Sequence, residues 1–196
     1  MNKKAAWILG AVVVVVVIIA VVAIGGNHGV STPGQNGQQQ APAAPYASTA
    51  DGFSVNLPGT PTMTSKSFTS PSAGSISETD YTYIASANGK GVVYMIIVFH
   101  YPATYQFPSN YLTGALKMFN TVINVKYPGT TVSAQPQSQF LGSPAITASV
   151  TVPFMGTPTP GNVLITTKGH NAYVVSAYGL SQGDYTAFQN SFSFTQ

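Results

Sequence analysis

Few side chains in this sequence could do chemistry, and the closest pair of acids is Glu78 and Asp80. They are two residues apart in a segment of alternating polarity, so on a β-strand both carboxylates would lie on one face, about 7 Å apart. That separation suits a hard cation, or the acid and base of a glycoside hydrolase. The alternative is that neither acid has a functional role. Both would then lie on the solvated face of an antiparallel strand, with Lys66 or Lys90 beside them across a hairpin.

Two histidines could add an imidazole to such a site. His100 ends the most apolar segment of the chain, and His170 lies in the turn KGHN. If either met Asp80 at one sheet edge, the pair could serve a hydrolase or begin a metal site. Nothing in the spacing requires such a meeting, so we predict no catalytic residue, no metal site and no cofactor.

The sequence does not indicate cysteine chemistry, a phosphate-binding loop or a nucleic-acid surface. The chain contains no cysteine, which excludes disulfides, thiolate metal sites and cysteine nucleophiles. The segment NGKG at residues 88–91 is explained more simply as a hairpin turn than as a phosphate loop. Only 6% of the residues are charged, and all seven basic residues are lysines, of which only Lys3 and Lys4 are adjacent. We therefore predict no nucleic-acid binding, which needs clustered Lys or Arg.

Aromatic side chains gather around the central hairpin and the loop that follows it. The segment YPATYQFPSNY, Tyr101–Tyr111, is bounded by prolines, and such a loop seldom buries all of its rings. Exposed Tyr and Phe on a rigid support are typical anchors of a binding surface. The predicted binding residues are Tyr101, Tyr105, Phe107 and Tyr111; the alternative is ordinary packing over the edge of the sheet.

The N-terminal region predicts a membrane anchor. Residues 5–24 contain no charged group, and about 20 helical residues at about 1.5 Å each span a bilayer core of about 30 Å. Lys3 and Lys4 precede this run and no cation follows until Lys66, so the positive-inside rule places the N-terminus in the cytoplasm. The alternative is a cleaved signal peptide, although this apolar run is longer than the apolar region of such peptides, which is usually about 7 to 15 residues. Both interpretations place the rest of the chain outside the cytoplasm.

Residues 25–50 predict a flexible linker, because they lack charge and hydrophobic periodicity and are rich in Gly, Gln, Pro and Ala. From Asp51 onward the chain alternates apolar and polar residues, first in FSVNL. Further strands are expected at residues 62–68, 75–86, 91–101, 131–140, 145–152, 162–168 and 172–178. Helices are expected at about 108–124 and after a capping box formed by Ser181 and Asp184. This order predicts an α+β fold with an antiparallel sheet.

Several short motifs also occur together. They are the opening FSVNLPGTP, the central hairpin, the corner GSPA, the strand AYVVSAYG and the closing FQNSFSF. In these features residues 51–196 resemble the α/β/α-sandwich superfamily typified by the PsbP subunit of the photosystem II oxygen-evolving complex, which includes many exported bacterial proteins. The resemblance implies a sheet flanked by helices and a role in binding partners or stabilising assemblies. It transfers no site residues.

The sequence thus predicts three parts: a cytoplasmic tip and transmembrane helix at 1–24, a linker at 25–50 and an extracytoplasmic α+β domain at 51–196. No Asn-x-Ser/Thr acceptor is present, which favours a bacterial envelope protein. The expected function is non-catalytic binding or scaffolding, with residues 5–24 in the membrane and an envelope protein, lipid or wall polymer as partner. The alternative is an envelope hydrolase that uses Asp80 with His100 or His170.

Overall fold

The computed structural model of the chain describes residues 44–87, 90–154 and 156–195. The transmembrane helix predicted at residues 5–24 and most of the predicted linker lie outside these residues. Within the described part of the chain, no helix is both long and apolar enough to cross a membrane.

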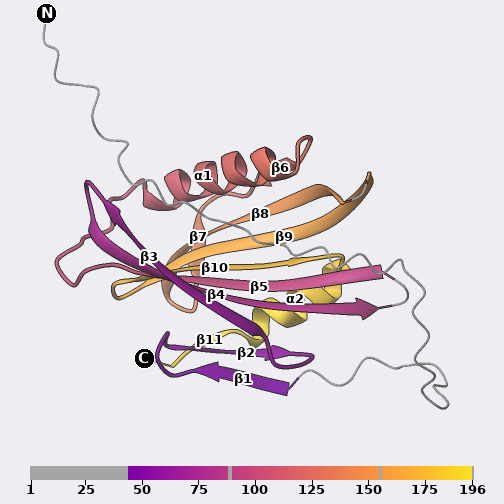
Figure 1. The fold of residues 1–196 in the computed structure, drawn as a ribbon, viewed down its shortest axis with the longest axis horizontal. Helices are drawn as coiled ribbons and strands as arrows, with labels where there is room; N and C mark the ends of the chain where they lie inside the picture. The colour runs from indigo at the N-terminus through magenta and orange to yellow at the C-terminus, as the bar shows by residue number, and fades with distance from the viewer. Residues whose placement is uncertain (1–43, 88–89, 155, 196) are drawn as a thin grey trace, which may run out of the picture.

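The described residues form two antiparallel sheets and two helices (Figure 1). The larger sheet has the strand order β3-β4-β5-β10-β9-β8-β6, with β7 paired to β8. Its strands are β3 (Thr62–Ser70), β4 (Gly74–Ala87), β5 (Lys90–His100), β6 (Thr131–Ala134), β7 (Ser138–Phe140), β8 (Ser143–Phe154), β9 (Thr157–Lys168) and β10 (Asn171–Tyr178). The smaller sheet has the order β1-β2-β11, with β1 (Ala44–Ser48), β2 (Phe53–Leu57) and β11 (Ser193–Phe194). The predicted α+β fold with antiparallel strands is confirmed.

The larger sheet is the middle one of three layers (Figure 1). Helix α1 (Tyr111–Lys126) packs on one face, which we call the α1 face. Helix α2 (Gln182–Ser191) and the smaller sheet pack on the opposite face, the α2 face. Each face has its own hydrophobic cluster, so the sheet separates two cores.

Strand β5 shows why the sheet is covered on both sides. It lies between β4 and β10, and successive side chains of a strand point to opposite faces. Ile97 and Phe99 belong to the cluster on the α1 face, whereas Ile96 and Val98 belong to the cluster on the α2 face. A strand buried on both faces must be apolar throughout, and the continuous run in the sequence predicts this central position correctly.

The two helices follow their sequence signals. In α1 the residues Leu112, Leu116, Phe119 and Ile123 form one buried stripe, as a period of 3.6 residues requires. Helix α2 begins with the predicted cap: the backbone N–H of Asp184 donates to the Ser181 hydroxyl oxygen at 3.2 Å.

The domain begins earlier in the sequence than predicted. Strand β1 lies inside residues 25–50, where we predict a linker, and it pairs with β2 along all five of its residues. Its sequence APYAS contains a single large side chain, Tyr46, so hydrophobic alternation could not reveal it. The Tyr46 ring lies 6.3 Å from Phe53 and 5.7 Å from Tyr81, measured between ring centroids. The single strand predicted at 131–140 is also replaced by two short strands, β6 and β7.

The hairpin between β7 and β8 holds a strained residue at its tip. Leu141 has a φ of 51° and is 51% exposed, so burial does not offset the strain. A left-handed conformation costs a residue with a β-carbon about 1 kcal/mol, and Asn tolerates it better than Leu. We expect Leu141→Asn to raise the free energy of unfolding by about 0.5 to 1 kcal/mol, measured by urea denaturation. A lower free energy of unfolding would show that the Leu141 side chain makes compensating contacts.

Candidate functional site

A groove of about 350 Å³ lies on the α1 face over β3, β4 and β5. Helix α1 packs on the same face of the sheet, but over β8 and β9, which lie toward the opposite edge. Five of the eight residues that line the groove are threonines or an aspartate: Thr60, Thr62, Thr64, Thr82 and Asp80. Ile84 and Met95 supply apolar surface, and Tyr83 lies at the edge with its ring packed against the cluster on the opposite face.

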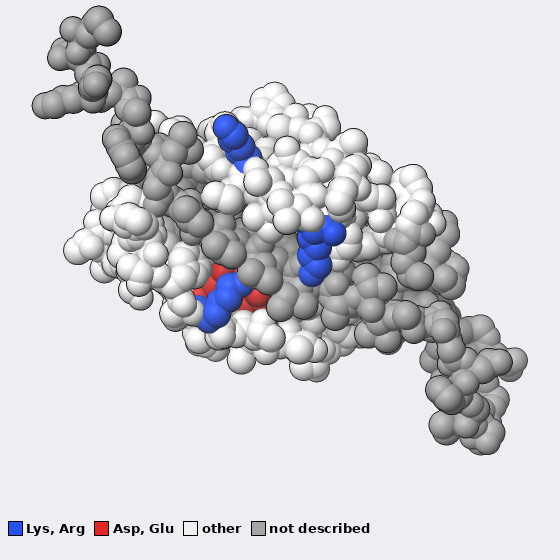
Figure 2. Space-filling view, turned by 45° about the horizontal axis from the view of Figure 1, so that its top comes forward, with Lys and Arg blue, Asp and Glu red and all other residues white. Residues whose placement is uncertain are grey.

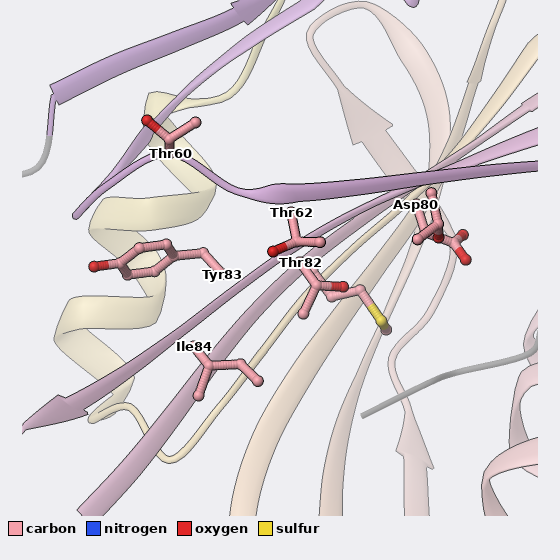
Figure 3. Close-up of a pocket in the computed structure, with 8 residues that line it drawn as sticks. Thr60, Thr62, Asp80, Thr82, Tyr83 and Ile84 are labelled. Carbon is pink, nitrogen blue, oxygen red and sulfur yellow. The ribbon is translucent and has the colours of Figure 1, made fainter. Parts of the chain in front are cut away.

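Strand register brings these groove residues together. Thr62 lies opposite Thr82, and Thr64 lies opposite Asp80. Directly opposed residues of an antiparallel pair share one face, so the hydroxyls and the carboxylate line up along the groove. Figure 3 shows Thr62 beside Thr82, with Asp80 at the far end of the row.

A buried charge cluster borders the groove at Asp80. The Lys66 ammonium lies 2.7 Å from Glu78 Oε1 and 4.0 Å from Asp80 Oδ2. Figure 2 shows acidic atoms beside a cationic side chain on this side of the molecule. The expectation that Lys66 lies beside the acids across a hairpin is confirmed. The expectation of a solvated face is wrong for Glu78, whose side chain is 0% exposed because it lies opposite Phe99 in the packed interior of the sheet.

Burial makes the cluster proton-dependent. It raises the pKa of the Glu78 carboxyl to about 8; the nearby Lys66 opposes this shift and the Asp80 charge adds to it. Burial also raises the pKa of Asp80, against the hydrogen bond from Glu78 and the charge of Lys66. Near neutral pH the Glu78 carboxyl therefore holds a proton.

Asp51 is the centre of a second polar network, on the α2 face. One carboxylate oxygen lies 2.6 Å from His100 Nε2, and the other accepts hydrogen bonds from the hydroxyls of Tyr81 and Ser48. The backbone carbonyl of Asp51 accepts from the Tyr173 hydroxyl at 2.9 Å. Asp51 lies in the turn between β1 and β2, so the network fastens the smaller sheet to β4, β5 and β10.

The order of groups in this network differs from that of a serine-hydrolase triad. There the imidazole lies between the serine and the carboxylate, whereas here the Asp51 carboxylate lies between Ser48 and His100. The other ring nitrogen of His100, Nδ1, lies 3.0 Å from Asn171 Oδ1. Both nitrogens are thus engaged inside the domain, and the geometry suits a structural role.

The structure does not bring Asp80 together with either histidine. Asp80 lies opposite Ile97 on the α1 face, and His100 lies on the α2 face. Across β5, Asp80 is in register with Val174 of β10. The exposed His170 is four residues before Val174, which corresponds to about 13 Å along the strand direction. Among the described residues, no three His, Asp or Glu side chains gather as metal ligands.

The four predicted aromatic residues form one cluster with two kinds of members. Tyr101 and Tyr111 are 5% and 9% exposed, and their hydroxyls are 2.9 Å apart. Tyr105 stacks on Tyr101 and Phe107 packs on Tyr111, each with ring centroids 4.6 Å apart. Tyr105 and Phe107 are half-buried, so they retain surface that a partner could reach. Their binding role stays a prediction.

Comparisons with known proteins show a similarity in structure but none in sequence family. No protein-family model matches the chain, and no curated protein matches its sequence. The chain is similar to the solution structure of cyanobacterial PsbP (CyanoP) from Synechocystis sp. PCC 6803. The TM-score is 0.49 and the identity 14%, over 87% of this chain and 98% of that chain. At this identity and TM-score, nothing about the function of the chain follows.

Sequence reasoning missed both Asp51 and the threonine row. Thr62 and Thr64 alternate on β3 in TMTSKSFTS, and this period of two was a signal that they share a face. For Asp51 no local signal exists, since its partners Tyr81 and His100 are 30 and 49 residues away.

Proposed function

We propose that this chain is a non-catalytic binding or scaffolding protein of the bacterial cell envelope. The apolar run at residues 5–24 supports an anchor in the membrane, which places the domain outside the cytoplasm. The internal engagement of Asp51 and His100 supports a binding role over the hydrolase alternative, because both groups serve to fasten the two sheets together.

The observation that carries the proposal is the hydroxyl-lined groove. Thr62, Thr64 and Thr82 offer both donors and acceptors, and Asp80 adds a carboxylate. Pockets of about 300 to 1,000 Å³ are typical of small-ligand sites, so the groove matches one or two residues of a polymer. A hydroxyl-rich wall polysaccharide fits this lining best among the envelope protein, lipid and wall polymer that the sequence predicts as partners.

The test measures binding of the full chain to purified peptidoglycan by co-sedimentation. In the double variant Thr64→Val and Thr82→Val the side-chain shape is kept and two hydroxyls are lost. At about 0.5 to 1.5 kcal/mol for each lost hydrogen bond, binding should weaken about tenfold. The matched control is Thr69→Val, an exposed threonine of β3 that points to the other face.

Two outcomes would contradict the groove as the binding surface. Equal binding by the double variant and the control would remove the threonine row. Loss of binding only in Tyr105→Ala or Phe107→Ala would move the surface to the aromatic loop.

A further inference from the structure

The sheet edges of this domain are not equally protected against pairing with another strand. An edge strand presents unpaired backbone N–H and C=O groups, and proteins protect such edges with short strands, proline or charge. The far edge of the larger sheet is formed by short strands, β6 with four residues and β7 with three. In the smaller sheet, β1 contains Pro45 and β11 has two residues.

Strand β3 is the exception. It has nine residues without proline, and among the described strands it pairs with β4 alone. Its pairing with β4 is unbroken from Thr62 to Ser70, so no bulge twists the edge away. Met63 on this strand is 58% exposed, which leaves apolar surface at the edge.

Lys66 is the one charged residue on β3, and it does not protect the edge in the usual way. Its ammonium lies 2.7 Å from Glu78 of β4, so it folds back over the sheet. A lysine protects an edge when its charge projects beyond the edge and must be desolvated by an incoming strand. Here the ammonium already has two partners within the chain, the carboxyl groups of Glu78 and Asp80.

The pattern of β3 fits a second copy of itself. If two β3 strands pair antiparallel with a two-fold axis at Ser65, Lys66 lies opposite Thr64 of the other copy. The exposed or half-buried residues 62–68 then all find a partner residue. An axis at Lys66 would oppose two lysines, and opposed like charges are destabilising. An axis at Ser67 would require pairing by Ser70, which is 2% exposed at the hairpin turn.

We propose that two copies of this chain associate through antiparallel pairing of β3 with β3, centred on Ser65. The pairing joins the two larger sheets into one continuous sheet, in an isologous contact in which each residue of one copy meets its symmetric counterpart. The inference does not depend on the proposed function.

The absence of cysteine from the natural sequence allows a clean test with single-cysteine variants of the full chain. Across the two-fold axis the α-carbons of residue 65 would be about 4.5 to 5.5 Å apart, within the range of a disulfide. Under mild oxidation, Ser65→Cys should form at least about five times more covalent dimer than Ser67→Cys on a non-reducing gel. Ser67 is the matched control because it is exposed on the same side of the same strand.

A second variant tests association without a covalent bond. Ser65→Lys would oppose two cations across the axis and should convert the dimer to a monomer in analytical ultracentrifugation, while Ser67→Lys, which faces Met63 of the other copy, should weaken it less. Equal crosslinking of the two cysteine variants would overturn the register. A natural chain that is monomeric at tens of micromolar would overturn the dimer, and so would a Ser65→Lys variant of unchanged mass.

Discussion

Replacing Asp51 by alanine should lower the free energy of unfolding by about 3 to 5 kcal/mol, because it leaves several hydrogen-bond donors without their acceptor, at about 1 to 3 kcal/mol for each buried group. Asp51 is 5% exposed, and its carboxylate contacts His100, Tyr81 and Ser48. Without it, two hydroxyls and one imidazole lose their acceptor in the space between the two sheets. Urea denaturation of the full chain, followed by far-ultraviolet circular dichroism, measures the change.

The matched control is Asp184→Ala, which removes an exposed acid in the first turn of α2. There the expected cost is at most about 1 kcal/mol, because the carboxylate keeps access to water. Hydrogen exchange of Asp51→Ala should also show faster exchange in β1, β2 and β11, since the network fastens the smaller sheet. A cost below about 1 kcal/mol would show that Asp51 does not hold the sheets together.

The elements that sequence predicts well are those whose signal is local. The apolar run of β5 and the stripe of α1 each report burial through the spacing of residues within one element. The Ser181 hydroxyl caps α2 through an interaction that spans three residues. In each case the residues that determine the structure are near one another in the chain, so the local sequence pattern predicts the element.

The features that sequence misses depend on partners far away in the chain. Strand β1 owes its position to backbone pairing with β2 and to the contacts of Tyr46, which APYAS cannot display as alternation. The sequence identifies Asp51 only as the first residue of the domain, because its partners Tyr81 and His100 are distant in the chain. The candidate site likewise has a part that the local sequence predicts and a part that depends on distant residues. The period of two places the Thr62 and Thr64 hydroxyls on one face, but it does not show that α1 packs over another part of that face.

Glu78 is the most informative of these cases. The alternation of β4 places Glu78 and Asp80 on the same face, as predicted, and a polar pair on a strand is usually solvated. Here Glu78 is fully buried, and the Lys66 ammonium of the neighbouring strand lies 2.7 Å from its carboxyl. Periodicity reports which residues share a face and leaves open whether water reaches that face. The depth of burial therefore has to be tested by a property that depends on it, which is the proton affinity of the carboxyl.

Because burial raises the pKa of Glu78 to about 8, the stability of the chain should fall as the pH rises from about 4.5 to about 8. Below pH 4.5 the carboxyl is protonated in both the folded and the unfolded chain, so burial costs nothing extra. Between the two values the unfolded chain loses the proton and the folded chain keeps it. The free energy of unfolding then decreases by up to about 1.4 kcal/mol per pH unit. The raised pKa of Asp80 acts in the same direction.

The variant Glu78→Gln should remove most of this pH dependence, since glutamine stays neutral at every pH and keeps the shape of the side chain. We expect the variant and the natural chain to be about equally stable near pH 4.5, and the variant to be more stable by ~4 kcal/mol near pH 8.5. Urea denaturation at several pH values measures both, with Asp184→Asn, which removes an exposed carboxylate, as the control. If the natural chain instead gains stability over this range, Glu78 is ionised in the folded state, and its pairing with Lys66 outweighs its burial.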